Sequence, residues 1–411
     1  PDSAIDVIDL CGASSTYNIT EPSDLADIQK ELMNIRKLKK DLCLSRRDNE
    51  LDEAIQKERN LKEKYNQIKE DFVNSLNDTI HEITEQDVLI AVSELSRIPI
   101  NKLSTDEMKR IANIDNILKS VVVGQDEAVD KVSKIIKRNR VGLGSKNRIA
   151  GNIFCCGPSG CGKTLLAKTI AKEIYGDENA LIRIDMSEYS EKNSVSKLTG
   201  AAPSYVGYEN GGQLTEAVKN KPYCVLLLDE IEKADQEVYN VFLQLFDEGR
   251  LTDSSGCLVN FKNVIVIMTS NIGAKEAQEG GASLGFVNTE NENKRSIYEK
   301  SLKRKFTPEF LNRIDQIVYF NSLTDDNLKT IIELELKKLK QRLNEMDLDL
   351  AWNNDIIDYL LPKAVKEKNY GARPIIRLIQ DEIEDVITDL LLTTTENIKN
   401  HCFKITVNDN I

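Results

Sequence analysis

One glycine-rich stretch could bind phosphate. Residues 157–164 match the pattern G-x-x-x-x-G-K-[ST], in which backbone N–H groups surround phosphate oxygens. Apolar residues 151–156 before it predict a buried strand, and residues 165–174 after it predict a helix, which is the setting that the pattern requires. We expect Lys163 to reach the β- and γ-phosphates of a nucleotide and the Thr164 hydroxyl to ligate Mg²⁺. The predicted nucleotide-contacting residues of this loop are Gly157, Pro158, Ser159, Gly160, Cys161, Gly162, Lys163 and Thr164.

Two acidic residues could serve the same nucleotide. Asp229 and Glu230 directly follow the apolar residues 224–228. At the carboxyl edge of a parallel sheet, Asp229 would hold Mg²⁺, and Glu230 would orient or deprotonate an attacking water. Asn271 follows another strand-like run, 264–270, and could position the same water. For Asn271 alone, an ordinary polar strand end is the default interpretation.

Two arginines could stabilise charge that develops during phosphoryl transfer. In GTPases such an extra positive charge raises the rate of phosphoryl transfer by a factor on the order of 10³–10⁵. Arg313 could reach the nucleotide of a neighbouring subunit, and Arg373, at a predicted helix start, could reach its own. From spacing alone, a surface salt bridge is the default interpretation of each arginine.

Two tyrosines lie on a loop rather than on a periodic element. Tyr205 and Tyr208 stand between Gly200 and the pair Gly211-Gly212. They could be exposed and grip another molecule, or they could fold onto the surface of the domain.

Composition limits the classes of function. The chain has 411 residues, enough for two or three domains, with 30% charged residues and a net charge of −12. This acidic balance disfavours nucleic acid as the main partner, and no run of 18 apolar residues could span a membrane. Only two histidines, His81 and His401, are present, which leaves little material for histidine-based catalysis. The eight cysteines lack paired C-x-x-C spacing, which indicates free thiols in a reducing compartment.

The middle of the chain alternates strand-like and helix-like segments. The predicted strands are 152–156, 181–185, 224–228 and 264–269. This alternation predicts the α/β class, with a parallel sheet and helices on both faces. A smaller, mostly helical C-terminal domain should follow. Its predicted elements are helices at 324–345, 353–369 and 373–392 and a strand at 402–407.

The N-terminal part predicts helices. Residues 25–72 lack Pro and Gly, are dense in charge and carry apolar residues at three- and four-residue steps, with a polar break at 45–49. We predict an antiparallel helical hairpin with coiled-coil character, which is either an arm for partner proteins or a packing element. Residues 1–12 predict a short helix ended by Gly12, expected to be the tail of a preceding domain.

These patterns predict five parts of the chain. They are a tail at 1–24, a helical-hairpin middle domain at 25–80, linker helices at 81–120 (84–95 and 105–120), a large nucleotide-binding subdomain at 121–320 and a small helical subdomain at 321–411.

Five motifs together resemble the second AAA+ module of a Clp-type unfoldase. They are Gly157–Thr164, Leu226–Glu230, Met268–Asn271, Phe310–Asp315 and Gly371–Arg373. The resemblance covers nearly the whole chain. It implies an AAA+ P-loop NTPase fold, ATP and Mg²⁺ as cofactors, and a hexameric ring that threads unfolded proteins through its pore.

The resemblance also implies roles for the matching residues. Lys163 and Thr164 match Walker A, Asp229 and Glu230 match Walker B, and Asn271 matches sensor 1. Arg313 is similar to the arginine finger that acts on a neighbouring subunit, and Arg373 to the sensor 2 arginine. The segment that lines the adenine pocket matches Val122 and Val123. The pore loop that grips a polypeptide matches Tyr205, Val206 and Gly207, although Ala202 and Ser204 depart from its usual sequence.

Two features resemble ClpC more than ClpB. The arm at 25–72 is similar to the short middle domain of ClpC, and the position of the loop that docks on ClpP carries Leu284, Gly285 and Phe286. The implied partners are other copies of the chain in a hexamer, unfolded protein substrates, a ClpP-type peptidase and an adaptor on the middle domain. A ClpB-like disaggregase, or a regulatory ATP-binding ring that scaffolds partners, are the alternatives. The Asn-, Lys- and Ile-rich composition is typical of AT-rich genomes, which suggests a plastid stroma (chloroplast or apicoplast) or a bacterial cytoplasm.

Overall fold

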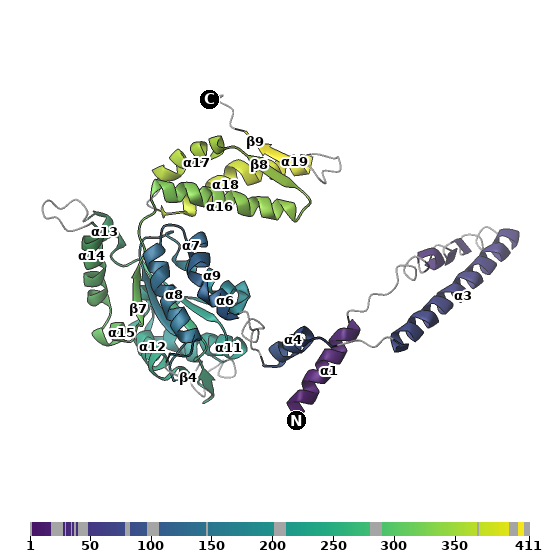
Figure 1. The fold of residues 1–411 in the computed structure, drawn as a ribbon, viewed down its shortest axis with the longest axis horizontal. Helices are drawn as coiled ribbons and strands as arrows, with labels where there is room; N and C mark the ends of the chain where they lie inside the picture. Colours follow the sequence, from purple (N-terminus) through teal and green to yellow (C-terminus); the bar gives the residue numbers. More distant parts are fainter. Residues whose placement is uncertain are drawn as a thin grey trace. The chain divides into compact units, whose positions relative to one another are not determined.

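Two compact units make up the chain, Pro1–Ser96 and Arg97–Ile411. The computed structural model (Figure 1) describes residues 2–17, 28, 30–33, 35–36, 38–39, 48–78, 83–96, 107–144, 147–200, 211–279, 290–367, 370–393 and 402–406. The division at Ser96 falls inside the predicted linker region, 81–120. The finer domain boundaries stay predictions.

The first unit contains helices that pack through a few apolar residues. Its longer described helices are α1 (Asp2–Tyr17), α3 (Asp48–Asp78) and α4 (Glu85–Ser96). Helix α1 packs against α4, where the buried Cys11 Sγ donates to the Asp87 carbonyl at 3.6 Å. The expected helix end at Gly12 is wrong, because α1 continues to Tyr17. A glycine inside a helix costs only about 1 kcal/mol, which packing against α4 can offset.

The described part of the arm agrees with a helical hairpin. Helix α3 is continuous from Asp48 to Asp78, and the described positions between 28 and 39 are helical as well. The two segments meet at Glu58 on α3. Its carboxylate forms ion pairs with Lys39 Nζ at 2.6 Å and with Arg36 Nε at 3.4 Å. Lys62, one turn further along α3, adds a third ion pair at 3.1 Å. Ion pairs from both segments therefore converge on one carboxylate.

A five-stranded sheet, parallel throughout, forms the centre of the second unit. Its order is β2 (Leu181–Asp185), β3 (Val225–Asp229), β6 (Ile265–Ser270), β1 (Gly151–Cys156) and β7 (Gln316–Tyr319). The four predicted strands are confirmed, and β7 was not expected. A separate antiparallel hairpin consists of β4 (Arg250–Thr252) and β5 (Leu258–Asn260).

Apolar cores cover both faces of the sheet, which confirms the predicted α/β class. Alternate strand residues point to opposite faces, so Phe154 and Leu226 belong to one core and Ile153 and Val225 to the other. One face packs against α10 (Val195–Thr199), α11 (Gln213–Asn220), α12 (Gln236–Glu248), α13 (Ala274–Glu279), α14 (Glu290–Lys305) and α15 (Pro308–Asn312). The other packs against α7 (Ile114–Val121), α8 (Asp126–Arg140) and α9 (Lys163–Tyr175).

One predicted linker helix differs from the expectation. Residues 105–120 were expected to form a single helix, but Asn113 separates α6 (Glu107–Ala112) from α7. Helix α7 then buries Ile114 and Leu118 against the sheet-covering helices. This packing places the following residues, Val122 and Val123, beside the phosphate loop.

A smaller lobe with its own apolar core ends the described chain. Its elements are α16 (Asp325–Asn344), β8 (Asp349–Trp352), α17 (Asn354–Lys366), α18 (Arg373–Ile379), α19 (Asp385–Thr393) and β9 (Cys402–Ile405). The expected helix 373–392 is interrupted by a π-helical turn at Gln380–Glu384. Strand β8, which was not predicted, pairs in parallel with β9.

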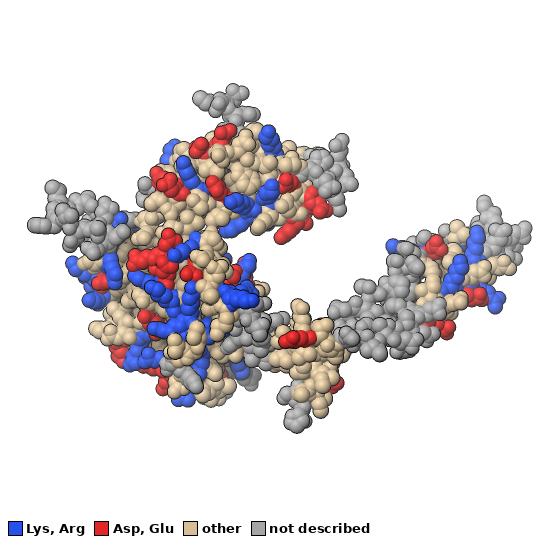
Figure 2. All heavy atoms as spheres, viewed as in Figure 1, with Lys and Arg blue, Asp and Glu red and all other residues tan. Residues whose placement is uncertain are grey.

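Charged side chains cover the outside of these cores. Figure 2 shows acidic and basic residues intermixed over the visible described surface of both lobes of the second unit. Across the described segments, the structure contains no helix with the length and apolar character needed to cross a membrane.

Candidate functional site

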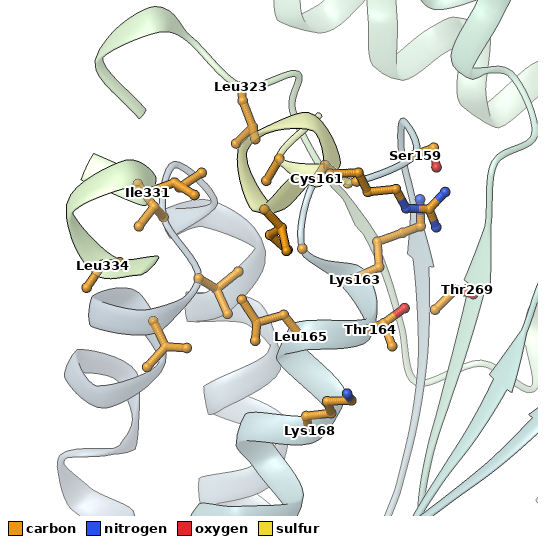
Figure 3. A pocket seen from close by; sticks show the side chains of 18 of the residues that line it. Ser159, Cys161, Lys163, Thr164, Leu165, Lys168, Thr269, Leu323, Ile331 and Leu334 are labelled. Atoms are coloured by element: carbon orange, nitrogen blue, oxygen red, sulfur yellow. The ribbon is translucent and has the colours of Figure 1, made fainter. Parts of the chain in front are cut away.

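The predicted chemical residues meet at the carboxyl edge of the sheet. Strands β3, β6 and β1 are neighbours and run in the same direction, with Cys156 opposite Ser270 and Leu228 opposite Met268. The segments that follow these strands therefore converge. They border a cavity of about 620 Å³, shown in Figure 3, to which both lobes of the second unit contribute side chains.

The phosphate loop connects β1 to α9 as the sequence predicts. Gly160 and Gly162 have φ angles of 71° and 104°, which residues other than glycine rarely adopt. Lys163, the first residue of α9, is only 8% exposed. Its Nζ donates to the carbonyls of Gly157 at 2.6 Å and Pro158 at 2.8 Å, and to Asn271 Oδ1 at 2.8 Å.

These three acceptors are all neutral, although the ammonium that they bind is buried. A buried cation is stabilised far better by an anion than by carbonyl oxygens. The N-terminus of α9 adds positive potential at the same place. This arrangement fits the binding of a phosphate group.

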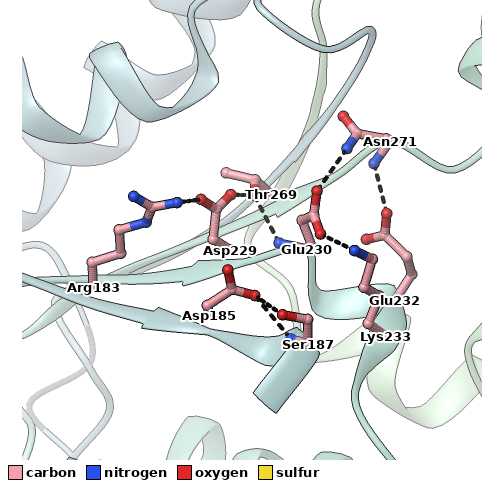
Figure 4. A network of polar contacts seen from close by, with 9 residues as sticks. All are labelled: Arg183, Asp185, Ser187, Asp229, Glu230, Glu232, Lys233, Thr269 and Asn271. Carbon is pink, nitrogen blue, oxygen red and sulfur yellow. Dashed lines mark hydrogen bonds and ion pairs between the residues drawn. The ribbon is translucent and has the colours of Figure 1, made fainter. Parts of the chain in front are cut away.

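The carboxylate of Asp229 is already held by two donors, as Figure 4 shows. Arg183 on β2 binds Asp229 Oδ2 at 2.7 Å, and the Thr269 hydroxyl on β6 donates to Oδ1. Asp185, at the end of β2, also lines the cavity, and hydrogen bonds from Ser187 hold its pKa below the usual value. The carboxylates therefore have fixed directions at the sheet edge.

Glu230 lies in a strained backbone conformation next to Asp229. Its φ angle is 54°, one of two positive values among the described non-glycine residues. The Glu230 N–H donates to Thr269 Oγ1 at 3.1 Å, and its carboxylate forms an ion pair with Lys233. The pairing raises the pKa of Lys233. Such strain at a functional site is maintained by the surrounding contacts.

Asn271 links the phosphate loop to Glu230. Its Oδ1 accepts from Lys163, its Nδ2 lies 3.5 Å from Glu230 Oε1, and its N–H donates to Glu232 Oε1 at 3.0 Å. The side chains of Lys163, Asn271, Glu230 and Lys233 thus form a continuous polar chain, part of which is drawn in Figure 4.

The two predicted arginines lie in different places. Arg373, the first residue of α18, is exposed and lines the large cavity. Arg313 is not among the lining residues of that cavity. It forms ion pairs with Asp247 and, at 4.0 Å, with Glu309, and it borders another cavity of about 230 Å³. The structure therefore brings Arg373, but not Arg313, to the phosphate loop of its own chain.

One end of the large cavity is apolar. Its apolar lining includes Val121, Val122, Val123, Leu323, Ile331, Leu334 and Ile376. Val122 is 1% exposed and packs in the same core as Cys161. An apolar compartment beside a phosphate loop fits a planar base next to its phosphates.

Cys161 is a packing residue within the loop. Its side chain is 3% exposed, and burial raises the pKa of the thiol. The uncharged thiol is a poor nucleophile, so the side chain of Cys161 serves packing in the core that it shares with Val122.

The oxygen donors at this site also fit a magnesium ion. The Thr164 hydroxyl and the Asp229 carboxylate line one cavity, and the described residues contain no cluster of three or more His, Cys, Asp or Glu side chains that could form a complete metal cage. Mg²⁺ typically binds one or two protein oxygens together with substrate phosphates and water.

Several important contacts could not be expected from the sequence. Arg183, Glu232 and Lys233 contact the predicted residues but belong to none of the short motifs, and Thr269 lies within the motif Met268–Asn271 without a predicted role. The strand register could have suggested the contact of Arg183 with Asp229, because Arg183 lies two residues before the end of a strand that neighbours β3.

Two further sets of predicted residues lie outside the described residues. They are the predicted pore-loop residues Tyr205, Val206 and Gly207 and the predicted docking residues Leu284, Gly285 and Phe286.

Two family models match adjoining parts of the chain. The model described as an AAA domain of the Cdc48 subfamily matches residues 148–317. The model described as the C-terminal, D2-small domain of ClpB protein matches residues 323–403. The two matches correspond to the sheet-containing lobe and the smaller lobe.

The chain is also similar to curated proteins over most of its length. The chaperone protein ClpB of Oceanobacillus iheyensis is 41% identical over 397 residues, which cover 95% of this chain and 49% of the relative. ClpC/MecB of Bacillus subtilis, a negative regulator of genetic competence, is 42% identical over 401 residues, 95% of this chain and 49% of the relative. The chain thus spans about half the length of these relatives.

Solved structures show the same arrangement of the fold. An Hsp104–ADP complex of S. cerevisiae has a TM-score of 0.69 and 36% identity, covering 79% of this chain and 56% of that one. A closed state of Hsp104 with ATPγS and FITC casein has a TM-score of 0.67 and 36% identity, covering 78% and 54%.

Proposed function

Because this chain belongs to the Clp family of AAA+ ATPases, we propose that it contributes to a hexameric ring that unfolds proteins with energy from ATP. One observation carries the proposal. Lys163, Asn271, Glu230 and Asp229 line one cavity; the first three side chains contact one another in sequence, and Asp229 joins them through the Thr269 hydroxyl. Binding groups and a general base are thus assembled at the same place.

The residues suggest a division of labour in ATP hydrolysis. We propose that Lys163 and the N–H groups of the loop bind the β- and γ-phosphates. Arg373, on α18, would contact the same phosphates. Thr164 and Asp229 would hold Mg²⁺, which supplies positive charge against the phosphate oxygens. The apolar residues at the other end, including Val122 and Val123, would contact the adenine.

Glu230 is the proposed general base. Its carboxylate would take the proton of the water that attacks the γ-phosphorus, and Asn271 Nδ2 would hold that carboxylate in place. When Lys163 binds phosphate instead of Asn271 Oδ1, the amide of Asn271 becomes available to orient the water. Asn271 could thereby connect phosphate binding to the position of Glu230.

Threading requires residues beyond the nucleotide site. We propose that Tyr205, Val206 and Gly207 grip the polypeptide and that Leu284, Gly285 and Phe286 dock on a ClpP-type peptidase, with an adaptor bound to the middle domain. The family and the names of the relatives support this proposal, since a ClpC of Staphylococcus aureus that is 39% identical is named as the ATP-binding subunit of a Clp protease. The bacterial relatives also favour a bacterial cytoplasm, whereas the plastid alternative rests on composition.

A peptidase-independent disaggregase is the second candidate. It is favoured by the ClpB relative, by the ClpB family model of the smaller lobe and by the Hsp104 structures. Recovery of an aggregated enzyme without peptidase would support it, and deletion of residues 284–286 should then have no effect.

The replacement Glu230→Gln tests the proposed chemistry. It removes the base and keeps the shape of the side chain, so we expect ATP turnover to fall by roughly 10²–10⁴-fold. ATP binding should persist, as measured by equilibrium binding of a fluorescent ATP analogue. ATP-dependent unfolding of a tagged fluorescent protein should stop.

The variant Glu237→Gln is a suitable control because Glu237 is exposed on α12 and does not line the cavity. Unchanged turnover in Glu230→Gln would refute the assignment of the base. Turnover without any unfolding by the parent protein would instead refute the proposed coupling to protein substrates.

A further inference from the structure

A buried glutamine joins the phosphate loop to the connection between the two lobes. Gln125 immediately precedes α8 and is 1% exposed. Its Oε1 accepts from the Asn321 N–H at 2.8 Å, and its Nε2 donates to the Asn321 carbonyl at 2.9 Å. Asn321 lies in the short segment that leads from β7 to α16, where the chain passes from one lobe to the other.

The same amide also reaches the phosphate loop. Gln125 Nε2 lies 3.4 Å from the carbonyl of Cys161. Both amide protons and the amide oxygen therefore face backbone groups of two segments that are distant in sequence. The Asn321 N–H must meet an oxygen, and this fixes which end of the amide faces which partner.

A second contact ties the phosphate loop to the smaller lobe. The Ala372 N–H donates to the Gly160 carbonyl at 3.0 Å, directly before α18. A Cβ at Gly160 would lie 2.2 Å from the Tyr370 carbonyl oxygen, so the two backbones touch without space for a side chain. Two neighbouring carbonyls of the loop are thus bonded: that of Gly160 to Ala372 of the smaller lobe, and that of Cys161 to Gln125, which holds the lobe connection.

These contacts resist independent movement. If the loop shifted relative to Asn321, buried amide and carbonyl groups would lose their partners, and such groups are costly to leave unsatisfied. The loop and the connection should therefore move as one body when phosphate binds.

We propose that Gln125 is a positioning residue that couples nucleotide binding at residues 157–164 to the angle between the two lobes. The proposal rests on the proposed function, because it assigns a route by which ATP would drive movement in the ring. Gln125 does not touch the nucleotide; it transmits the state of the loop to the lobe connection.

The exposed cysteines allow a direct test. Cys257, between β4 and β5, and Cys402, on β9, are exposed on different lobes. The described cysteines other than these two are buried. With Cys43 changed to Ser, donor and acceptor dyes at positions 257 and 402 would report the distance between the lobes by energy transfer.

In the labelled parent protein, we expect ATP to change the energy transfer. In Gln125→Leu, which preserves size but removes the hydrogen bonds, most of this change should disappear at saturating ATP, and the dissociation constant for ATP should shift with it, because coupling is reciprocal. Turnover should fall by roughly 10- to 100-fold, as expected when catalytic groups are displaced. Gln125→Met, which keeps the length of the side chain without its amide and adds no buried charge, covers the case in which the leucine variant does not fold.

Gln316→Leu is the matched control, because Gln316 lies on β7 and its side chain donates only to the adjacent Ile317 carbonyl at 3.1 Å. It should behave as the parent. An unchanged ATP response in a folded Gln125 variant would overturn the proposal. So would a parent protein whose lobes do not respond to ATP, because no coupling would then exist.

The two proposals fail in different ways. A parent protein that binds ATP and changes its energy transfer without hydrolysis would refute the proposed ATPase chemistry of this chain. The energy-transfer comparison between Gln125→Leu and Gln316→Leu would still decide the role of Gln125, because energy transfer responds to ATP binding and does not require hydrolysis.

Discussion

Lys163 shows how this site is prepared for an anion. The ammonium group is buried and is bound by two carbonyls and one amide oxygen. Neutral acceptors compensate only part of the desolvation of a charged group. The remaining cost makes this position favourable for a phosphate, which would replace Asn271 as a partner of Lys163.

We therefore expect Lys163→Ala to weaken ATP binding by about 1.5–3 kcal/mol, or roughly 10- to 150-fold, as loss of a hydrogen bond to a charged group does. Lys168→Ala is the control, because Lys168 lines the same cavity with an exposed side chain. Isothermal titration with a non-hydrolysable ATP analogue measures both. Equal losses in the two variants would contradict a specific role for Lys163.

The residues of the site were predictable where they are adjacent in sequence to a strand end. Glycine spacing identified the loop, and apolar runs placed Asp229, Glu230 and Asn271 at one sheet edge. Gln125 could not be predicted, because its partner Asn321 is 196 residues away. Arg183 and Lys233 were also missed, since contacts that depend on tertiary packing leave no local pattern.

Strands and helices could likewise be predicted where a local sequence pattern marks them, and were missed where it does not. The central strands are apolar on both faces, which produces a clear signal. Strand β7 lies at the sheet edge and is mostly half-buried, so Gln316–Tyr319 lacks that signal. The break at Asn113 and the π-helical turn at Gln380–Glu384 interrupt helical patterns without a proline or a glycine.

The described arm depends on charge as well as on apolar packing. Glu58 is 8% exposed and interacts with Lys39, Lys62 and Arg36. Its hydrogen bonds with Lys39 and Lys62 lower the pKa of the Glu58 carboxyl from 4.5 to about 2. Because the pKa is lower in the folded state, the stabilisation is complete above pH 4.5 and disappears as the pH falls toward about 2.

We expect Glu58→Gln to loosen the arm at neutral pH. Hydrogen–deuterium exchange of residues 48–78 should be faster than in the parent, and the two proteins should become alike as the pH falls from about 4.5 to about 2. Glu63→Gln is the control, since Glu63 is exposed and pairs only loosely with Arg59 at 3.8 Å. A difference that persists at the lowest pH would point to packing rather than to charge.

At the scale of the whole molecule, the position of Arg313 is compatible with the proposed ring. It is held on its own chain by Asp247, while Asn152 Nδ2 on β1 donates to the Arg313 carbonyl at 3.1 Å. Its side chain is 34% exposed, and Arg138 and Arg148 border the same small cavity. An arginine that is anchored at the base of the phosphate-loop strand but lies outside its own nucleotide cavity is well placed to act on a neighbour in a head-to-tail ring.

A mixture of two inactive proteins can test this action between subunits. Arg313→Ala keeps its own Glu230 but offers no arginine to its neighbour, whereas Glu230→Gln offers the arginine but lacks the base. Each alone should be strongly impaired, because loss of the base costs roughly 10²–10⁴-fold and an arginine finger contributes on the order of 10³–10⁵ in rate in GTPases. In an equal mixture, about a quarter of the head-to-tail interfaces would combine an intact Glu230 with an arginine from the next subunit.

ATP turnover should therefore reappear in the mixture, in proportion to the mixed interfaces. The control mixes Arg313→Ala with the double variant Glu230→Gln/Arg313→Ala, which can supply neither group, and should stay inactive. Light scattering would verify that both mixtures form assemblies of the same mass. Assemblies that mix without recovering turnover would show that Arg313 acts within its own chain or only stabilises the fold, because in either case a neighbour could not restore what the variant lacks.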